Sequence, residues 1–161
     1  MINPQSRRWC FTINNYDDSS IDMLEKLIEI LEIKYLIIGF EEAPTTGTPH
    51  LQGYMHLRRL TYRKTIMTMC EDLQTTNENK LKFFSYLKEC YGSETDNINY
   101  CRKGGKFKEY GQPSETIKKE LERQSRTKEI MNDWLLMCQE DFESKWPYEA
   151  VHWRTKLESW A

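Results

Sequence analysis

His50 and Gln52 are two residues apart in a stretch, Thr48 to Leu57, in which polar and apolar side chains alternate. Alternation is typical of a strand with one buried face, and residues i and i+2 of a strand point to the same side. An imidazole and an amide about 7 Å apart could both reach one bound cation. The same spacing also fits a turn residue after Pro49 followed by a solvent-facing amide, so the residues alone leave both interpretations open.

Two carboxylates, Glu41 and Glu42, end an apolar, β-rich stretch that begins at Lys34. The segment Pro44 to Gly47 predicts a turn, and a hairpin through it would bring a carboxylate next to His50. A mixed set of oxygen and nitrogen ligands suits Mg²⁺ or Mn²⁺ better than zinc. The residues do not decide between Glu41 and Glu42.

Tyr100 and Lys103 are three residues apart in a short polar segment that we predict to be helical, from Asp96 to Lys103 and ended by Gly104-Gly105. Residues with this spacing share a helix face. A tyrosine hydroxyl is a poor nucleophile at neutral pH unless a cation or a base assists it, and a lysine one turn away could supply that charge. The alternative is a packed tyrosine beside a solvated lysine.

The elements that must position these residues alternate in type along the chain. The order β-α-β-β-α-β-α-β, with a short connection between the second and third strands, favours an antiparallel sheet with helices packed on one face, an α+β sandwich. The predicted helices cover residues 20–33, with a capping box at Ser19-x-x-Asp22, then 62–73 and 96–103; the predicted strands cover residues 8–13, 34–42, 48–57, 82–88 and 106–110.

Composition excludes several classes of protein. The chain has 161 residues, of which 39% are hydrophobic and 30% charged, which is typical of a globular protein. Its apolar runs are too short to span a bilayer and no signal-type segment follows Met1, so we expect a soluble protein that is neither secreted nor bound to a membrane. Five cysteines without a CxxC motif predict ordinary thiols in a reducing compartment rather than disulfides or a zinc site.

Positive charge is concentrated around the candidate residues. The net charge is −2, yet residues 50–110 carry 11 basic and 7 acidic side chains. Basic residues there alternate with aromatic ones, a mixture suited to phosphates and stacked bases. A solvated basic face explains the charge equally well.

Residues 114–161 differ in composition from residues 1–113, and we predict a domain boundary between them. The later segment is charged and helix-forming, with a weak apolar stripe up to about Phe142, and Pro147 prevents one unbroken helix. We expect a linker or an assembly element, through which the chain could form a homo-oligomer.

Three motifs, taken together, resemble those of a known family. Phe11-Thr12-Ile13-Asn14-Asn15, Pro49-His50-Leu51-Gln52-Gly53-Tyr54 and Tyr100-Cys101-Arg102-Lys103 are similar, in this order, to the motifs of the replication initiators (Rep) of circoviruses, nanoviruses and related small circular single-stranded DNA viruses. The similarity covers roughly residues 7–113. It implies an endonuclease of the HUH type on a ferredoxin-like five-stranded antiparallel sheet.

The resemblance also implies roles for individual residues. Glu41, His50 and Gln52 would hold the Mg²⁺ or Mn²⁺ ion, with Gln52 in the place of a second histidine. Tyr100 would attack single-stranded origin DNA at a stem-loop and form a 5′-phosphotyrosine, assisted by Lys103, to start rolling-circle replication in the host nucleus. The candidate DNA contacts are Arg8, Asn14, Asn15, Tyr54, Arg58, Arg102 and Lys106.

The chain departs from the family pattern in two places. The segment from Leu60 to Phe83 is longer than in circoviruses, which implies an enlarged loop around Glu71–Leu81. The helicase module and its GxxxxGK[ST] phosphate loop are absent from the sequence, which fits a truncated chain and a naturally short one alike. The alternative function that we keep is a non-catalytic module that binds single-stranded nucleic acid on a similar sheet.

Overall fold

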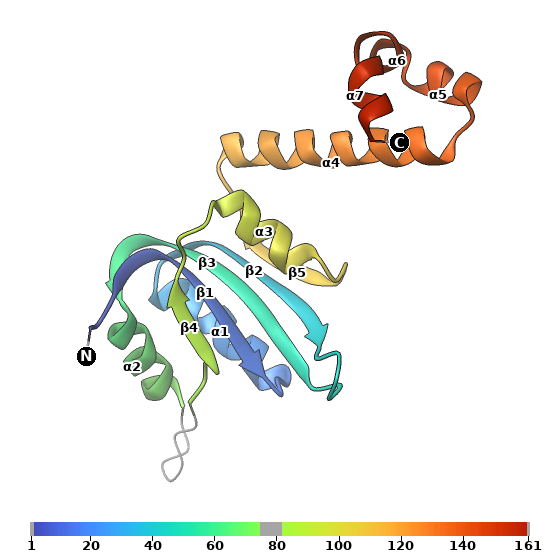
Figure 1. Cartoon of the computed structure of the whole chain (residues 1–161). Helices are drawn as coiled ribbons and strands as arrows, with labels where there is room; N and C mark the ends of the chain where they lie inside the picture. Colours follow the sequence, from blue (N-terminus) through green and yellow to red (C-terminus); the bar gives the residue numbers. More distant parts are fainter. Residues whose placement is uncertain (1, 75–81, 161) are drawn as a thin grey trace. The chain divides into compact units, whose positions relative to one another are not determined.

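The computed structural model describes residues 2–74 and 82–160 and divides into two compact units, Met1–Pro113 and Ser114–Ala161. The division falls where the composition changes along the chain. The first unit contains, in chain order, β1 (Gln5–Asn14), α1 (Asp18–Ile30), β2 (Ile33–Glu42), β3 (Pro49–Tyr62), α2 (Arg63–Leu73), β4 (Tyr86–Glu89), α3 (Glu94–Arg102) and β5 (Phe107–Gly111) (Figure 1).

The five strands of the first unit form one antiparallel sheet in the order β4-β1-β3-β2-β5. Strands β1 to β4 with helices α1 and α2 have the βαββαβ order of a ferredoxin-like fold, and β5 extends the sheet beside β2. The predicted α+β fold with a five-stranded antiparallel sheet is therefore confirmed. The central strand is β3, which pairs with β1 on one side and β2 on the other.

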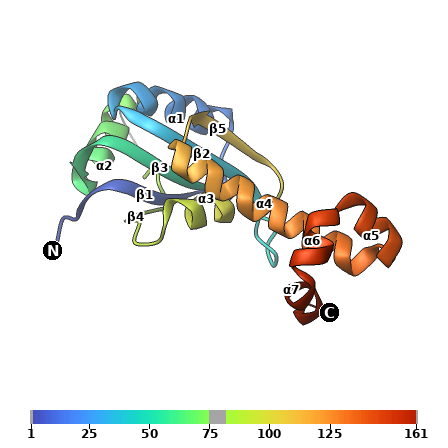
Figure 2. The same ribbon diagram turned by 90° about the horizontal axis from the view of Figure 1, so that it is seen from above.

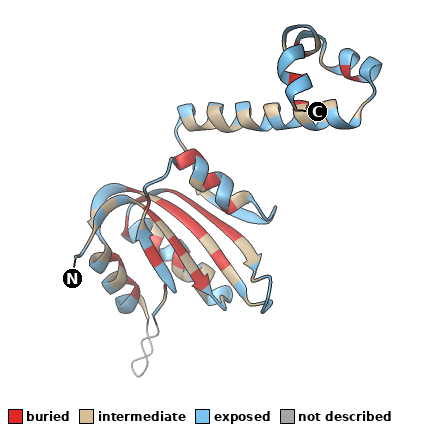
Figure 3. Cartoon of the chain, in the orientation of Figure 1, coloured by how far each residue is buried: buried red, intermediate tan, exposed pale blue. Residues whose placement is uncertain are grey.

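One face of the sheet is apolar and is covered by α1 and α2. Side chains such as Phe11 and Ile38 from the sheet meet Leu24 and Leu27 of α1 in a continuous core. Figure 3 shows the buried positions recurring along the strands. Phe11 packs flat against β3, because its partner in the register is Gly53, where an added Cβ would lie 2.0 Å from the Phe11 ring. The alternation read in the sequence thus produces a buried face.

The opposite face of the sheet carries α3, which corrects the expectation that all helices pack on one face. Figures 1 and 2 show α1 and α2 on one side of the sheet and α3 on the other. Helix α3 lies against β2 and β3, and its backbone comes so close that a Cβ at Gly39 would be 2.2 Å from the Cys101 carbonyl oxygen. The absence of a side chain at Gly39 is what admits the helix.

Several predicted elements differ in their bounds from the observed ones: β1 and β3 are longer than predicted, and α3 begins at Glu94 rather than at Asp96. Helix α1 begins earlier and ends earlier than residues 20–33, because Asp17 is its N-cap and forms a capping box with Ser20, while Ile33 already belongs to β2. Strand β4 is confined to Tyr86–Glu89, so residues 82–85 of the predicted strand lie before it. The enlarged loop predicted near residues 71–81 falls largely on residues 75–81, outside the described part; residues 71–73 end α2.

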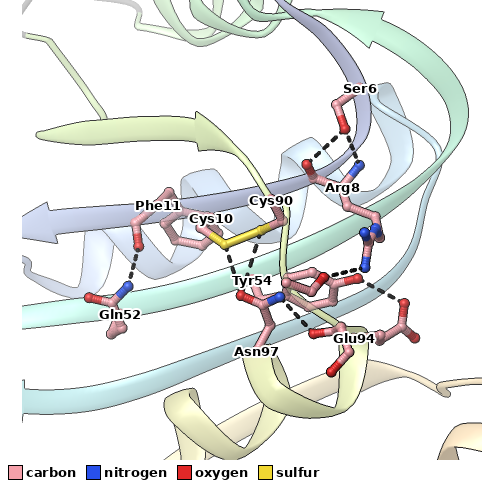
Figure 4. Close-up of a disulfide and its surroundings, with 11 residues drawn as sticks. Ser6, Arg8, Cys10, Phe11, Gln52, Tyr54, Cys90, Glu94 and Asn97 are labelled. Atoms are coloured by element: carbon pink, nitrogen blue, oxygen red, sulfur yellow. Dashed lines mark hydrogen bonds between the residues drawn. A yellow bond between two sulfur atoms is a disulfide. The ribbon is translucent and has the colours of Figure 1, made fainter.

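A disulfide joins Cys10 of β1 to Cys90, the residue after β4, and this corrects the expectation of five thiols (Figure 4). The two residues are 80 positions apart in sequence, yet β1 and β4 are neighbours in the sheet, so their Cα atoms lie 5.7 Å apart. Cys70, Cys101 and Cys138 are free thiols. Burial raises the pKa of Cys70 and of Cys101 to about 12, so both stay protonated.

The second unit is helical, with α4 (Glu115–Leu136), α5 (Gln139–Lys145), α6 (Pro147–His152) and α7 (Arg154–Ser159). Ser114 caps α4, and Pro147 starts α6, where its missing N–H costs nothing. Ile130, Phe142 and Leu157 form a small core surrounded by tryptophans. Within residues 2–74 and 82–160, no helix has both the length and the apolar character that crossing a bilayer requires.

Candidate active site

Glu41 and His50 face each other across the β2–β3 hairpin. They are direct partners in the antiparallel register, and His50 Nε2 lies 3.1 Å from Glu41 Oε2. The hairpin that the turn residues predicted is therefore present. Glu42 pairs with Pro49 and is exposed, so the structure brings Glu41 rather than Glu42 to the imidazole.

Lys103 joins this pair to Tyr100. Its Nζ atom lies 2.8 Å from Glu41 Oε1 and 3.4 Å from the centre of the Tyr100 ring. Lys103 follows the last turn of α3, and Tyr100 lies in that turn with 53% of its surface exposed. The alternative in which Tyr100 packs in the interior is thus wrong. Three separate elements, β2, β3 and α3, bring the four side chains together.

The charges of this cluster favour an ammonium at Lys103. Burial works to lower the pKa of Lys103, but contacts with the Glu41 carboxylate and with Tyr100 outweigh it, and the net shift is upward. Lys103 therefore stays protonated at neutral pH. It can stabilise negative charge on a neighbouring oxygen, and it is unsuited to accept a proton there.

Gln52 lies on the same face of β3 as His50, as the two-residue spacing predicted. Its amide is held from β1, since Thr12 Oγ1 lies 3.2 Å from Gln52 Oε1 and Gln52 Nε2 donates to the Phe11 carbonyl oxygen at 3.4 Å. This fixes the amide group with its oxygen accepting, so a lone pair of that oxygen is still available.

The residues present fit a hard divalent cation. Glu41 Oε1 is buried and, apart from its ion pair with Lys103, no described residue gives it a hydrogen bond of good geometry. A buried carboxylate oxygen of this kind can serve as a ligand beside the imidazole of His50 and the amide of Gln52. Among the described residues, no three histidine, cysteine or acidic side chains are grouped so that they could hold a metal ion.

A hollow of about 660 Å³ opens beside the cluster. It can admit a nucleotide-sized group, since ligand sites are typically about 300–1,000 Å³. Its lining combines carboxylate, imidazole, ammonium and aromatic groups: Tyr16, Phe40, Glu41, Glu42, Pro44, Pro49, His50, Lys103, Gly104 and Lys106.

Several candidate DNA contacts lie near this hollow. Lys106 lines it, and Asn14 pairs with His50 in the register and is exposed. Asn15 adopts a left-handed backbone conformation (φ 52°) and donates its N–H to the Pro49 carbonyl oxygen. The Asn-Asn turn thus closes the end of β1 beside the second motif. Arg102 is held 2.5 Å from Glu109 and is less free to reach a phosphate.

Other candidates lie elsewhere. Tyr54 is fully buried under α3 and donates a hydrogen bond to Glu94, so it offers no surface for a base, which corrects that assignment. Arg8 donates to the Gly92 carbonyl oxygen at 2.9 Å. Arg58 is exposed eight residues after His50, about 26 Å along β3. The basic and aromatic residues of the sequence are therefore not one continuous surface.

Sequence reasoning missed the groups that hold α3 on the sheet. Glu94 is 9% exposed and binds Tyr54 and His56, and Glu109 binds Arg102 and Tyr35. Ser93, the residue before Glu94, is of a type that commonly caps the start of a helix. This serine was the available sequence signal for where α3 begins. The burial of Glu94 could not be predicted from the sequence, because this burial depends on which face of the sheet α3 covers.

The comparisons with known proteins agree with the three motifs. The family model described as "Putative viral replication protein" matches residues 6–104. The chain belongs to this viral replication protein family. It is 37% identical over 113 residues to the replication-associated protein of Human associated cyclovirus 1, covering 70% of this chain and 36% of that protein.

Two further relatives show the range of the family. The replication-associated protein of Beak and feather disease virus is 36% identical over 99 residues, which are 62% of this chain and 29% of that protein. The Para-Rep C1 protein of Faba bean necrotic yellows C11 alphasatellite is 27% identical over 151 residues, 94% of this chain and 47% of that protein. The chain thus spans less than half the length of these relatives, and the resemblance to circular single-stranded DNA virus Rep proteins is confirmed.

Proposed function

We propose that the first unit nicks and rejoins single-stranded DNA through Tyr100, as the initiating step of rolling-circle replication. The observation that carries the proposal is the position of Lys103, which contacts both the exposed Tyr100 ring and the Glu41 carboxylate that pairs with His50. A nucleophile and a set of cation ligands from three elements thereby meet beside one open hollow.

In the proposed reaction, Tyr100 Oη releases its proton to solvent water and attacks the phosphorus of the scissile phosphodiester. The bond between phosphorus and O3′ breaks, O3′ takes up a proton from water, and the 5′-phosphate stays on the tyrosine. Because one ester replaces another, the bond energy is conserved and a 3′-hydroxyl can later reverse the step. The exposure of Tyr100 allows a strand to approach the hydroxyl directly.

Lys103 acts in this reaction as a fixed positive charge. Its raised pKa keeps the ammonium protonated while the phenol loses its proton, so the developing phenolate and the phosphate oxygens are stabilised. Lys106, which lines the same hollow, adds a second cation for the DNA backbone.

Glu41, His50 and Gln52 are the proposed ligands of a Mg²⁺ or Mn²⁺ ion. When bound, the ion would supply Lewis-acid stabilisation of the charge on the scissile phosphate. The chain contributes the geometry: Thr12 fixes the Gln52 amide, and the β2–β3 register holds Glu41 opposite His50.

Family membership supports the biological setting of the proposal. We assign the substrate as origin DNA with a single-stranded stem-loop, and the host nucleus as the place of action. We assign self-assembly to residues 114–161, where Leu135, Leu136, Tyr148 and Val151 are exposed apolar side chains.

The decisive experiment is a denaturing adduct assay with a pool of hairpin oligonucleotides whose loops are randomised, in the presence of Mn²⁺. A 5′-phosphotyrosine retains the downstream fragment, so only a 3′-terminal label should stay with the protein after denaturation. Tyr100→Phe should abolish the labelled band, while Tyr91→Phe, at another exposed tyrosine, should retain it. A band that survives Tyr100→Phe would exclude Tyr100 as the nucleophile.

The same assay tests the alternative, a module that binds single-stranded nucleic acid without cleaving it. The basic and aromatic groups near the hollow are compatible with that function. Such a module would shift the oligonucleotides in a native gel and leave no covalent band under denaturing conditions, whichever end carries the label.

A further inference from the structure

A buried carboxylate, Glu94, is placed where it can control the position of the helix that carries Tyr100. Glu94 is the first residue of α3 and is 9% exposed. Its Oε2 atom accepts a hydrogen bond from Tyr54 Oη at 2.8 Å and lies 2.6 Å from His56 Nδ1. We call Tyr54, His56 and Glu94 the N-terminal clamp of α3. The reaction proposed above uses none of these three groups.

The protonation states of the clamp suit strong hydrogen bonds. Burial raises the pKa of Tyr54, and the hydrogen bond to Glu94 raises it further, so the phenol remains a donor. Burial also works to raise the pKa of Glu94, but hydrogen bonds with His56 and Tyr54 outweigh it, so the pKa is lowered and the group remains a carboxylate. A buried donor and an ionised acceptor form one of the stronger classes of hydrogen bond.

The clamp connects the helix to the strand that holds the proposed cation ligands. Tyr54 and His56 lie on β3, two and four residues after Gln52, on the same face of the sheet. A rigid strand therefore links His50 and Gln52 at one end to the start of α3 at the other. Figure 4 shows Tyr54 and Glu94 directed toward each other from these two elements.

The rest of α3 is also attached to the sheet, through the buried Thr95, Ile98 and Cys101 and through Asn97, which lies beside the Cys10–Cys90 disulfide. Among its described residues, Ile98 and Cys101 are the fully apolar ones that are buried, and Arg102 is held at the far end by Glu109. A nine-residue helix is too short to be stable by itself in water. Its position over the sheet must come from such contacts, and the N-terminal clamp is its most buried polar one.

We propose that Glu94 is a positioning residue for Tyr100, acting through Tyr54 and His56, which set where α3 lies along β3. This rests on the proposed nicking function. If the clamp is released at its N-terminus, α3 can shift over Gly39 and carry the Tyr100 hydroxyl away from the phosphate, while Glu41, His50 and Gln52 stay on the sheet. DNA binding and the fold should then persist while cleavage slows.

The test compares single-turnover rates of adduct formation, dissociation constants for the same oligonucleotides from fluorescence anisotropy, and thermal melting. Glu94→Gln should slow adduct formation about 10- to 100-fold, the cost of a small misplacement of a reacting group. The dissociation constant should change less than about twofold. The matched control is Glu89→Gln: Glu89 accepts a similar bond from Tyr91 at 2.6 Å, on the surface and away from α3.

Substitutions of His56 distinguish a positioning role from a merely structural one, because they compare the reaction rate with and without a hydrogen-bond donor to Glu94. His56→Leu removes the donor and should slow the reaction like Glu94→Gln, whereas His56→Asn places an amide N–H near the position of Nδ1 and should recover most of the rate. If Glu94→Gln does not fold, Tyr54→Phe removes one hydroxyl, keeps the ring, and should still slow adduct formation several-fold.

The outcomes separate the two proposals. Folded variants that melt at lower temperature but form adduct at the wild-type rate, or equal rates for His56→Leu and His56→Asn, would overturn the positioning role and leave the nicking function standing. A wild-type protein that forms no adduct would overturn both.

Discussion

The two faces of the sheet differ in what they bury. The face under α1 and α2 is closed by apolar side chains in one core. The face under α3 also buries apolar side chains, such as Ile37 and Ile98, but it adds polar contacts of Glu94 and Arg102 near the two ends of the helix. All the side chains proposed to act on DNA, namely Glu41, His50, Gln52, Tyr100 and Lys103, lie on the α3 side or on α3. We therefore expect substitutions under α1 and α2 to change mainly the free energy of unfolding. Substitutions of the proposed site residues should change mainly the rate of adduct formation.

The largest loss of stability should follow a substitution on the face of the sheet that α1 and α2 cover. Phe11→Ala should lower the free energy of unfolding by about 3–5 kcal/mol, because the ring is fully buried against Gly53 and Phe84. Tyr86→Ala is the matched aromatic truncation on the other face, where the side chain is half-exposed, and should cost less than about 1 kcal/mol. Urea unfolding of both variants measures the difference. Equal losses would contradict the division between the faces.

The disulfide should be an exception to the separation between the two faces. It lies on the α3 side of the sheet and should still stabilise the fold. Cys90→Ser should lower the free energy of unfolding by about 2–4 kcal/mol, since the bond closes a long loop in the unfolded chain. Cys138→Ser, at an exposed thiol, should leave it unchanged. Thiol titration of the denatured, unreduced protein should find three thiols; five would show that the bond is not formed.

The smallest expected change in free energy concerns the α3 side of the sheet, where it tests whether Glu41 or Glu42 is the proposed cation ligand. Glu41→Gln should slow adduct formation about 100-fold, equivalent to about 2.7 kcal/mol, with little change in unfolding. Glu42→Gln should change the rate less than about twofold, since Glu42 is exposed and does not pair with His50. The reverse result would assign the ligand to Glu42. Adduct formation that continues in excess EDTA would contradict the cation role of either residue.

Much of this fold follows from local patterns in the sequence. The alternation around His50 and the turn after Glu42 predict the hairpin, and the observed register then shows that Glu41 rather than Glu42 faces His50. The glycines after Lys103 likewise end the third helix near its observed end. These features depend on residues close in sequence, which is why they could be read from it.

The features that could not be predicted depend on contacts between distant segments. The resemblance implied that Tyr54 contacts DNA, but α3 covers Tyr54 and leaves it no surface for DNA. The pairing of Cys10 with Cys90 required knowing that β4 lies beside β1. The choice of face for α3 depends on the absence of a side chain at Gly39, whose role becomes visible only with the helix in place.

The central place of β3 has a consequence for local opening of the protein. Strands at the edge of a sheet can separate transiently without unfolding the whole domain, whereas a strand bonded on both sides opens with the core. His50, Gln52, Tyr54 and His56 all lie on β3, so the ligands and the helix anchor belong to the part that opens last. Edge strand β5 can then open locally while the spacing between anchor and ligands stays fixed, whereas the Cys10–Cys90 disulfide holds β4 to β1.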